Sequence, residues 1–323
     1  MNIAAARWIP YALPLRQPWI TAGGRINERR GRLLRLETAD GRVGWGDCAP
    51  LPAAGIDEAA AIRFAAECAR LDLAAQAAGL PLAQWLHGSA VAGEIAVNAS
   101  LGGATAITPE TVAAACAAGF TILKIKVGSA EPDREIRALQ TLATGLPAVV
   151  RFRLDANRAW DEATAAGFIA ACGALPVEAI EEPLRTPNLA ALARLQAATA
   201  IALALDESLP ALPREAFLAQ RPVRRLVLKP AALGGLRATL ELARSARAAG
   251  LECVVTSALE SACGLFAVAH LAAAVSVGLE TPPAQGLATA GWFAADTGEP
   301  PRLAAGRLIL PDIPGIGFAP GIS

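Results

Sequence analysis

Two lysines, Lys124 and Lys126, lie two positions apart in the run TILKIKVG, which otherwise has the composition of a buried β-strand. Because side chains alternate between the faces of a strand, both ammonium groups share one face. A single charge at a strand end is most often a solvated rim residue. Charged residues of the same parity recur, however, at the ends of later strand-like runs: Arg153, Asp155, Glu181, Asp206 and Lys229. Burying unpaired charges is costly, so the set predicts a functional site.

Three of these residues, Asp155, Glu181 and Asp206, are carboxylates on consecutive strand-like runs. Three like charges at neighbouring strand ends would repel one another, and a hard divalent cation removes that repulsion. Oxygen ligands without histidine or thiolate favour Mg²⁺, or Mn²⁺, over zinc. Only one residue of the pair Glu181 and Glu182 can face inward, and we expect Glu181. Glu182 and Glu207 are interpreted as residues that support the ligands.

The lysines suggest a general base. A lysine acts as a base when its pKa falls from about 10.4 toward about 7 to 8, which burial, a like charge and a nearby cation promote. We expect Lys126 to be the base, Lys124 to help keep it neutral, and Lys229 to lie across the site. A metal with lysine suits removal of a proton next to a carboxylate, because the resulting enediolate needs strong cationic stabilisation. His87 and His270 are not at strand ends and are interpreted as ordinary helix residues.

Alternating elements must position these side chains. From residue 96 onward, strand-like runs alternate with alanine-rich helical runs, and the polar residues that end the runs are 23 to 31 positions apart. About eight such units in about 200 residues are typical of a (β/α)8 barrel, whose active sites lie at the C-terminal ends of the strands. A doubly wound open sheet has the same alternation and is the competing fold.

The preceding segment, residues 1–95, differs in pattern and predicts an α+β capping domain. It contains a hairpin signal around the dipeptide Asp40-Gly41, followed by a helical run from Asp57 to Gly79. We expect the barrel to span residues 96–294 and the tail, residues 295–323, to return to the capping domain. The glycine-containing stretch ITAGGRINERRG is expected to be a mobile loop over the barrel mouth. Its Arg25 is a candidate substrate contact, although Arg29, Arg30 and Arg32 also fit a solvated charge run.

Composition limits the remaining functions. The chain has 323 residues, 54% of them hydrophobic, with 29 basic and 29 acidic residues, so it offers no charge excess for nucleic acid. No apolar run approaches the roughly 20 residues of a membrane helix, and no secretory signal is recognisable. The six cysteines are at least ten positions apart, which fits buried thiols and no metal or redox motif. We expect a cytoplasmic protein that acts on a small carboxylate; the pattern leaves the oligomeric state open, and a monomer is compatible with it.

The segments KIK, RLDAN, IEEP, LDES and LKPAALGG, in this order over residues 96–290, resemble the enolase superfamily and its muconate-lactonising subgroup. The N-terminal segment resembles the capping domain of that subgroup, so the resemblance extends over nearly the whole chain. It implies a modified (β/α)8 barrel, Mg²⁺ on the three carboxylates, and lysines as catalytic groups.

Within the subgroup the chain most resembles the o-succinylbenzoate synthases, dehydratases of menaquinone biosynthesis. Their pattern has an arginine two residues before the metal aspartate, here Arg153, and a segment similar to TSALESACGL. The resemblance implies that Lys126 removes the α-proton and then protonates the departing hydroxyl in a syn elimination. Lys229 would stabilise the enediolate, Arg153 would hold the substrate, and Ser257 would contact its succinyl chain.

Other activities of the subgroup remain open. N-succinylamino acid racemases resemble the same lysine pair and metal site, and a succinyl pocket would serve both reactions. Dipeptide epimerases carry an Asp-x-Asp near the eighth strand, but VGLETPPAQGLATAG contains no aspartate. A cycloisomerase is a third alternative. A non-catalytic anion-binding barrel would belong to a different class, but such a receptor would not need three carboxylates flanked by lysines.

Overall fold

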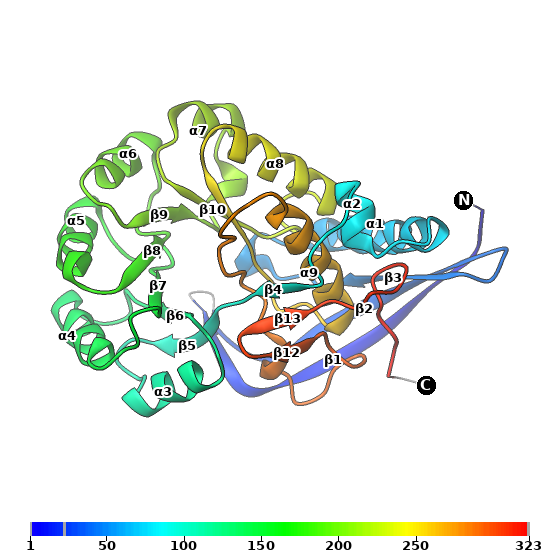
Figure 1. Ribbon diagram of the computed structural model, residues 1–323, viewed down its shortest axis with the longest axis horizontal. Helices are drawn as coiled ribbons and strands as arrows, with labels where there is room; N and C mark the ends of the chain where they lie inside the picture. Colours follow the sequence, from blue (N-terminus) through cyan, green and yellow to red (C-terminus); the bar gives the residue numbers. More distant parts are fainter. Residues whose placement is uncertain (1, 22–23, 322–323) are drawn as a thin grey trace.

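The computed structural model describes residues 2–21 and 24–321. Its N-terminal part is an antiparallel sheet of β1 (Ile3–Thr21), β2 (Gly24–Thr38) and β3 (Val43–Cys48), in the order β1-β2-β3. β1 and β2 form the long hairpin drawn in blue in Figure 1. The expected loop at residues 20–31 is therefore wrong for most of its length, because its residues pair as strands; Ala22 and Gly23 lie outside the described residues.

Helix α1 (Glu58–Ala77) packs on this sheet and is followed by α2 (Leu82–His87); the turn η1 (Pro52–Ala54) precedes them. The helix begins where the sequence predicts, since the Asp57 side chain accepts a hydrogen bond from the Ala60 amide. Two glycines of β3 permit the close packing. A Cβ at Gly46 would lie 1.9 Å from the Ala65 carbonyl oxygen, so a larger residue would displace the helix.

The central part is a seven-stranded parallel sheet in the order β11-β10-β9-β8-β7-β6-β5, curled with helices outside it (Figure 1). Its strands are β5 (Ala99–Gly103), β6 (Ile122–Lys126), β7 (Arg151–Asp155), β8 (Val177–Glu181), β9 (Ala202–Leu205), β10 (Arg225–Leu228) and β11 (Glu252–Val255). Its helices are α3 (Pro109–Ala117), α4 (Pro132–Ala143), α5 (Glu162–Ala171), α6 (Leu189–Ala197), α7 (Arg214–Gln220), α8 (Leu236–Ala248) and α9 (Ala262–Ser276); short turns are η2 (Cys172–Ala174), η3 (Leu209–Ala211) and η4 (Ala290–Trp292).

Two residues occupy the eighth position of the barrel. Gln285 pairs with Val97 beside β5, and Gly286 pairs with Thr256 beside β11, so the two edges of the parallel sheet are joined. The predicted (β/α)8 barrel is thus confirmed in modified form. The eighth strand, expected near the stretch VGLETPPAQGLATAG, is reduced to this two-residue bridge. A Cβ at Gly286 would lie 2.2 Å from the Thr256 hydroxyl oxygen, which explains the glycine.

The tail contacts the capping domain and the start of the barrel. Strands β12 (Arg302–Ala304) and β13 (Arg307–Ile309) form a small sheet with β4 (Glu94–Ala96), seen as red and cyan ribbons side by side in Figure 1. On α9, the His270 imidazole accepts from the Ala83 amide and bonds the Ile316 carbonyl; burial lowers the pKa of His270 to about 4.

We retain, as a proposal, the division into a capping domain of residues 1–95 with 295–323 and a barrel domain of residues 96–294.

Two carboxylates of the capping domain bind the N-termini of barrel helices. Asp47 accepts hydrogen bonds from the backbone amide and hydroxyl of Ser261 at the start of α9, at 2.8 and 2.9 Å. Glu67 accepts from the Leu236 amide at the start of α8, at 2.5 Å. Since these amides have no partner within their own helices, the two parts of the chain complete each other's hydrogen bonding. Within the described ranges, no helix has the length and apolarity needed to cross a bilayer.

Candidate active site

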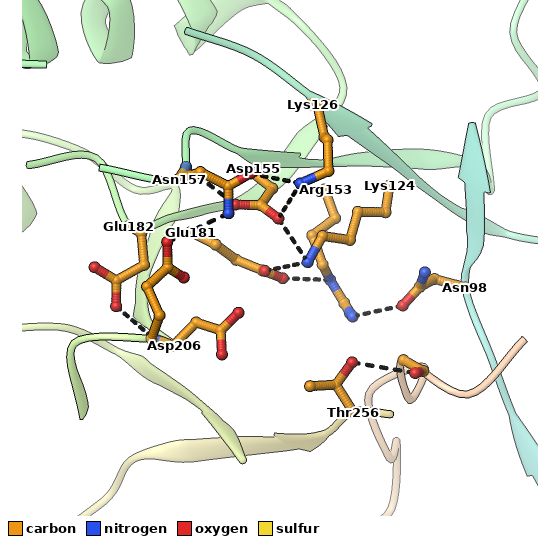
Figure 2. Close-up of polar contacts among 12 residues, drawn as sticks. Asn98, Lys124, Lys126, Arg153, Asp155, Asn157, Glu181, Glu182, Asp206 and Thr256 are labelled. Carbon is orange, nitrogen blue, oxygen red and sulfur yellow. Dashed lines mark hydrogen bonds and ion pairs between the residues drawn. The ribbon is translucent and has the colours of Figure 1, made fainter. Parts of the chain in front are cut away.

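The barrel brings the lysines and carboxylates that the sequence singled out to the C-terminal ends of the strands. The register pairs Lys126 with Asp155 and Asp155 with Glu181, so these residues end neighbouring strands at one level. Asp206 and Lys229 directly follow β9 and β10. Figure 2 shows Lys124 and Lys126 reaching from one side toward Asp155 and Glu181.

Ammonium groups lie among the carboxylates. Lys124 Nζ is 3.0 Å from an Asp155 carboxylate oxygen and 2.5 Å from one of Glu181. Lys229 Nζ is 2.7 Å from Asp206 Oδ2. Lys124 therefore directs its charge at two carboxylates, and its expected effect on the protonation of Lys126 stays a prediction.

The protonation equilibria reflect this crowding. Burial and the charges of Asp155 and Asp206 raise the pKa of Glu181, and burial raises the pKa of Asp206 despite Lys229. Burial opposes ionisation of Asp155 too, but Lys124 and Lys126 lower its pKa to about 2. Burial works against the charge of Lys124, yet Asp155 and Glu181 raise its pKa. The cluster thus holds carboxylates with unequal proton affinities within one buried site.

Asn157 is a residue whose role the sequence did not reveal. Its side-chain oxygen accepts a hydrogen bond of 2.5 Å from Lys126 Nζ, and its amide nitrogen donates to Glu207 at 3.3 Å. Its backbone is left-handed, with φ 43°, a conformation that asparagine adopts more readily than most residues. The parity of RLDAN, in which Asn157 shares a face with Asp155, was the available signal. Asn157 aims the Lys126 amine at the cavity.

Glu182 supports the adjacent strand end. One of its carboxylate oxygens accepts from the Asp206 amide at 2.6 Å and from the backbone and hydroxyl of Ser208. Burial, with repulsion from Glu207, raises the pKa of Glu182 to about 7. This placement agrees with the expected supporting role, because Glu182 holds the backbone that carries Asp206.

The three carboxylates have the donor chemistry that suits a hard divalent cation, although in this structure they contact lysine ammonium groups. Considering residues 2–21 and 24–321, no three His, Cys, Asp or Glu side chains are close enough together to hold a metal ion. Lys124 and Lys229 instead lie against the three carboxylates. Because Asp155, Glu181 and Asp206 are all buried and present only oxygen donors, they are the residues that would hold Mg²⁺ or Mn²⁺ once their side chains converge.

Two of the residues expected to contact the substrate, Arg153 and Arg25, do not line the inner cavity. Arg153 is 1% exposed and lies beneath the cavity, where it bonds the Asn98 side chain, the Ala284 carbonyl and Glu178. These bonds hold neighbouring strands together, and the expected contact of Arg153 with the substrate stays a prediction. Arg25 is exposed and bonds Asn27, away from the cavity lining.

Ser257 lies in the cavity wall, but its hydroxyl is already engaged. It donates to Glu260 at 2.6 Å and accepts from the Thr289 hydroxyl and the Leu259 amide. A hydroxyl has one proton to donate, so the expected contact with a substrate would require Ser257 to release Glu260.

Two adjoining cavities open above the cluster. The inner one, of about 120 Å³, is lined by Lys124, Lys126, Asp155, Asp206 and Lys229 together with apolar wall residues. The outer one, of about 420 Å³, lies between the β1–β2 hairpin and the barrel. Trp19 and Trp292 line both cavities, with ring centroids 6.3 Å apart in an edge-to-face arrangement. The site therefore has an inner part with charged walls and an outer part beside two aromatic rings.

This combination of capping sheet, parallel barrel and lysines facing buried carboxylates defines a class of capped barrel enzymes. Residues 107–321 match the family "Enolase C-terminal domain-like", and the chain belongs to the enolase superfamily. It is 33% identical to an o-succinylbenzoate synthase of Edwardsiella ictaluri over 303 residues, covering 84% of this chain and 87% of that protein.

Two solved structures show how far the likeness extends. The substrate-liganded L-Ala-D/L-Glu epimerase of Bacillus subtilis superposes with a TM-score of 0.86 and 26% identity, covering 98% of both chains. A dipeptide epimerase of Enterococcus faecalis, complexed with Mg and a dipeptide, has a TM-score of 0.87 at 23% identity, covering 98% of this chain and 99% of that one. The relatives therefore establish the superfamily and an enzyme, and they include more than one reaction.

Proposed function

We propose that the protein is an o-succinylbenzoate synthase, a lyase that dehydrates 2-succinyl-6-hydroxy-2,4-cyclohexadiene-1-carboxylate to 2-succinylbenzoate in menaquinone biosynthesis. The observation that carries the proposal is the pair of lysine sites, Lys126 and Lys229, on either side of a buried carboxylate trio at the base of a cavity. The 33% identity to the Edwardsiella enzyme supports this substrate. We place the reaction in the cytoplasm.

Lys126 acts as the base. Its Nζ, held by Asn157, removes the proton next to the substrate carboxylate, and the electron pair of that C–H bond enters the carboxylate to form an enediolate. Lys229, as an ammonium ion, stabilises the developing negative charge. Lys124 keeps Asp155 and Glu181 in place and presents charge toward the substrate carboxylate. Mg²⁺ on Asp155, Glu181 and Asp206 would supply further positive charge for the same carboxylate.

The second step is loss of the hydroxyl group. The enediolate electron pair returns to form the ring double bond, the C–O bond breaks, and the ammonium of Lys126 delivers its proton to the departing hydroxide as water. Because one residue takes and returns the proton, the two groups leave from one face of the ring, a syn elimination. The ring becomes aromatic, which favours completion.

N-succinylamino acid racemisation is the second candidate. It is favoured by the positions of Lys126 on β6 and Lys229 just after β10, since a racemase needs one base on each face of the α-carbon. The similarity of the chain to an epimerase structure also supports this candidate. The two activities share proton abstraction and differ in the fate of the enediolate.

The deciding experiment compares both substrates on one preparation loaded with Mg²⁺. We expect kcat/KM for the cyclohexadiene carboxylate to exceed that for N-succinylamino acids. The reverse order would make the protein a racemase, and binding without turnover of any carboxylate would support an anion receptor. An Asn157→Asp variant would probe the contribution of the Lys126 amine to each reaction, because it keeps the size of the side chain while adding a negative charge beside Lys126.

A further inference from the structure

One buried arginine joins the capping domain to the cavity wall. Arg29, on β2, is 4% exposed, whereas its neighbour Arg30 is exposed and pairs with Glu28. The run of arginines is therefore not uniformly solvated: Arg29 points into the protein. A charged side chain buried to this degree must be compensated by several hydrogen bonds.

All the hydrogen bonds of the Arg29 guanidinium go to backbone carbonyls. Nε donates to Leu259 at 3.1 Å, Nη1 to Pro50 at 2.8 Å and Nη2 to Ala49 at 3.0 Å. Ala49 and Pro50 belong to the capping domain, whereas Leu259 belongs to the barrel, in the turn between β11 and α9. The planar fork of arginine can fix three acceptors in one geometry, which a single ammonium cannot do.

Both segments held by Arg29 form the wall of the inner cavity. Leu51 and Ala54 contribute from the capping domain, and residues 257–259 contribute from the barrel. The distance between these segments sets the width of the cavity on this side. A shift of one against the other would displace the contacts to the part of a ligand that lies away from Lys126.

The barrel segment is also under backbone strain. Leu259 has φ 57°, a left-handed conformation that leucine rarely adopts and that strains the backbone. Its amide bonds the Ser257 hydroxyl at 3.0 Å, and Glu260 accepts from the Ser257 hydroxyl and the Ala258 amide. The carbonyl of the strained residue is the one that Arg29 Nε holds. The surroundings therefore stabilise a turn that would otherwise relax.

We propose that Arg29 is a positioning residue that holds the strained turn at Leu259 against residues 49–51 and thereby sets the cavity wall that contacts the substrate away from the reacting carbon. The role rests on the proposed function, because it takes the inner cavity as the substrate site. It predicts that loss of the clamp weakens substrate binding more than it slows the chemical step, since Lys126 and Lys229 are held by other contacts.

The test uses Arg29→Met and Arg29→Lys in the full chain, with Arg30→Met as the matched control on the same strand. Amide hydrogen exchange at residues 258–260 and the steady-state constants are measured for each. For both Arg29 variants we expect exchange about tenfold faster, equivalent to about 1.4 kcal/mol of opening free energy, and a KM about tenfold higher, with kcat within about threefold of wild type. Arg30→Met should match wild type.

Leu259→Gly tests the link to strain, because glycine adopts a left-handed backbone at little cost. In that background, Arg29→Lys should change exchange and KM less than it does alone. An equal change in both backgrounds, unchanged exchange in Arg29→Met, or wild-type behaviour of Arg29→Lys would each overturn the proposal. If Arg29→Met does not fold, the Arg29→Lys and Leu259→Gly pair decides.

Hydrogen exchange separates this proposal from the proposed function. If wild type turns over neither substrate, the function fails, while faster exchange in the Arg29 variants would still support the clamp. If turnover is present and exchange is unchanged, the clamp alone fails.

Discussion

The barrel interior contains two ion clusters that differ in construction. The lower one consists of Arg153, Glu178, Arg225 and Glu252, and the upper one consists of the lysines and carboxylates at the mouth. In the lower cluster, arginine forks bind Glu178 at 2.7 to 2.8 Å and, against the effect of burial, lower its pKa to about 2. In the upper cluster the carboxylates are unequal: burial raises the pKa values of Glu181 and Asp206, whereas Lys124 and Lys126, against burial, lower that of Asp155 to about 2.

The difference distinguishes charged groups that are fully paired with one another from charged groups that remain available to a ligand. Arginine cannot lose its proton and matches a carboxylate in two directions, so the lower cluster is electrostatically satisfied. Lysine is a single point of charge that can exchange a proton, and the upper carboxylates repel one another beside a cavity. The lower cluster stabilises the protein, whereas the upper cluster retains charge that a substrate or cation would complete.

The largest effect is expected from the upper cluster. Lys126→Ala and Lys229→Ala should each lower kcat by about 10³-fold, since each removes a group that transfers a proton or stabilises charge in the transition state. Circular dichroism should show an unchanged fold. Full activity in either variant would contradict the mechanism.

Removal of divalent cations should act on the upper cluster as well. Chelation should abolish turnover, and added Mg²⁺, or Mn²⁺, should restore it, because Asp155, Glu181 and Asp206 then regain a counter-charge. Asp206→Asn should weaken the cation's affinity by more than the roughly 10- to 100-fold typical of an outer partner, measured by titration calorimetry. Activity that survives thorough chelation would exclude the metal.

The lower cluster should respond in stability and not in catalysis. Glu178→Gln leaves Arg153 and Arg225 partly uncompensated, and for a side chain 20% exposed we expect a loss of about 2 kcal/mol in the free energy of unfolding. The urea midpoint measures it. The kcat of the folded enzyme should stay within about twofold of wild type, and a large fall in kcat would show that the clusters are coupled.

The smallest expected effect is the change in the free energy of unfolding with pH in the acidic range. The pKa of Glu178 falls from 4.5 unfolded to about 2 folded, so its contribution is complete above pH 4.5 and is lost as the pH falls toward 2. Urea midpoints at several pH values should therefore drop less steeply in Glu178→Gln over this range. Burial lowers the pKa of His270 from 6.5 to about 4, so the free energy of unfolding also decreases as the pH falls between these values. This contribution is the same in wild type and in Glu178→Gln.

Much of the site could be predicted because alternation along short strands is strict. It placed Lys124, Lys126 and Asp155 on one face, and the spacing of the units indicated a barrel. The partner of Arg153 could not be read this way. The register shifts between Phe152 and Arg153, so Glu178 lies at a bulge in β8, where simple alternation fails.

The hairpin was harder to predict for a different reason. β1 contains Pro10, Pro14 and Pro18, which argue against a strand, but an edge strand tolerates proline because its outer amides need no partner. The burial of Arg29 could not be inferred from alternation either, because Leu33 and Leu34, which have opposite parity, are both buried on β2.

The helix caps supplied by Asp47 and Glu67 have a consequence for folding in time. The Asp47 contact with Ser261 spans 214 positions, and Asp72 binds the Ile316 amide across 244. During synthesis the capping sheet emerges long before these partners, so Asp47 and Asp72 lack their long-range contacts until the distant segments appear. Contacts of such separation slow folding and prolong exposure to aggregation. The enzyme should therefore depend on chaperones during synthesis more than its compact native structure would indicate.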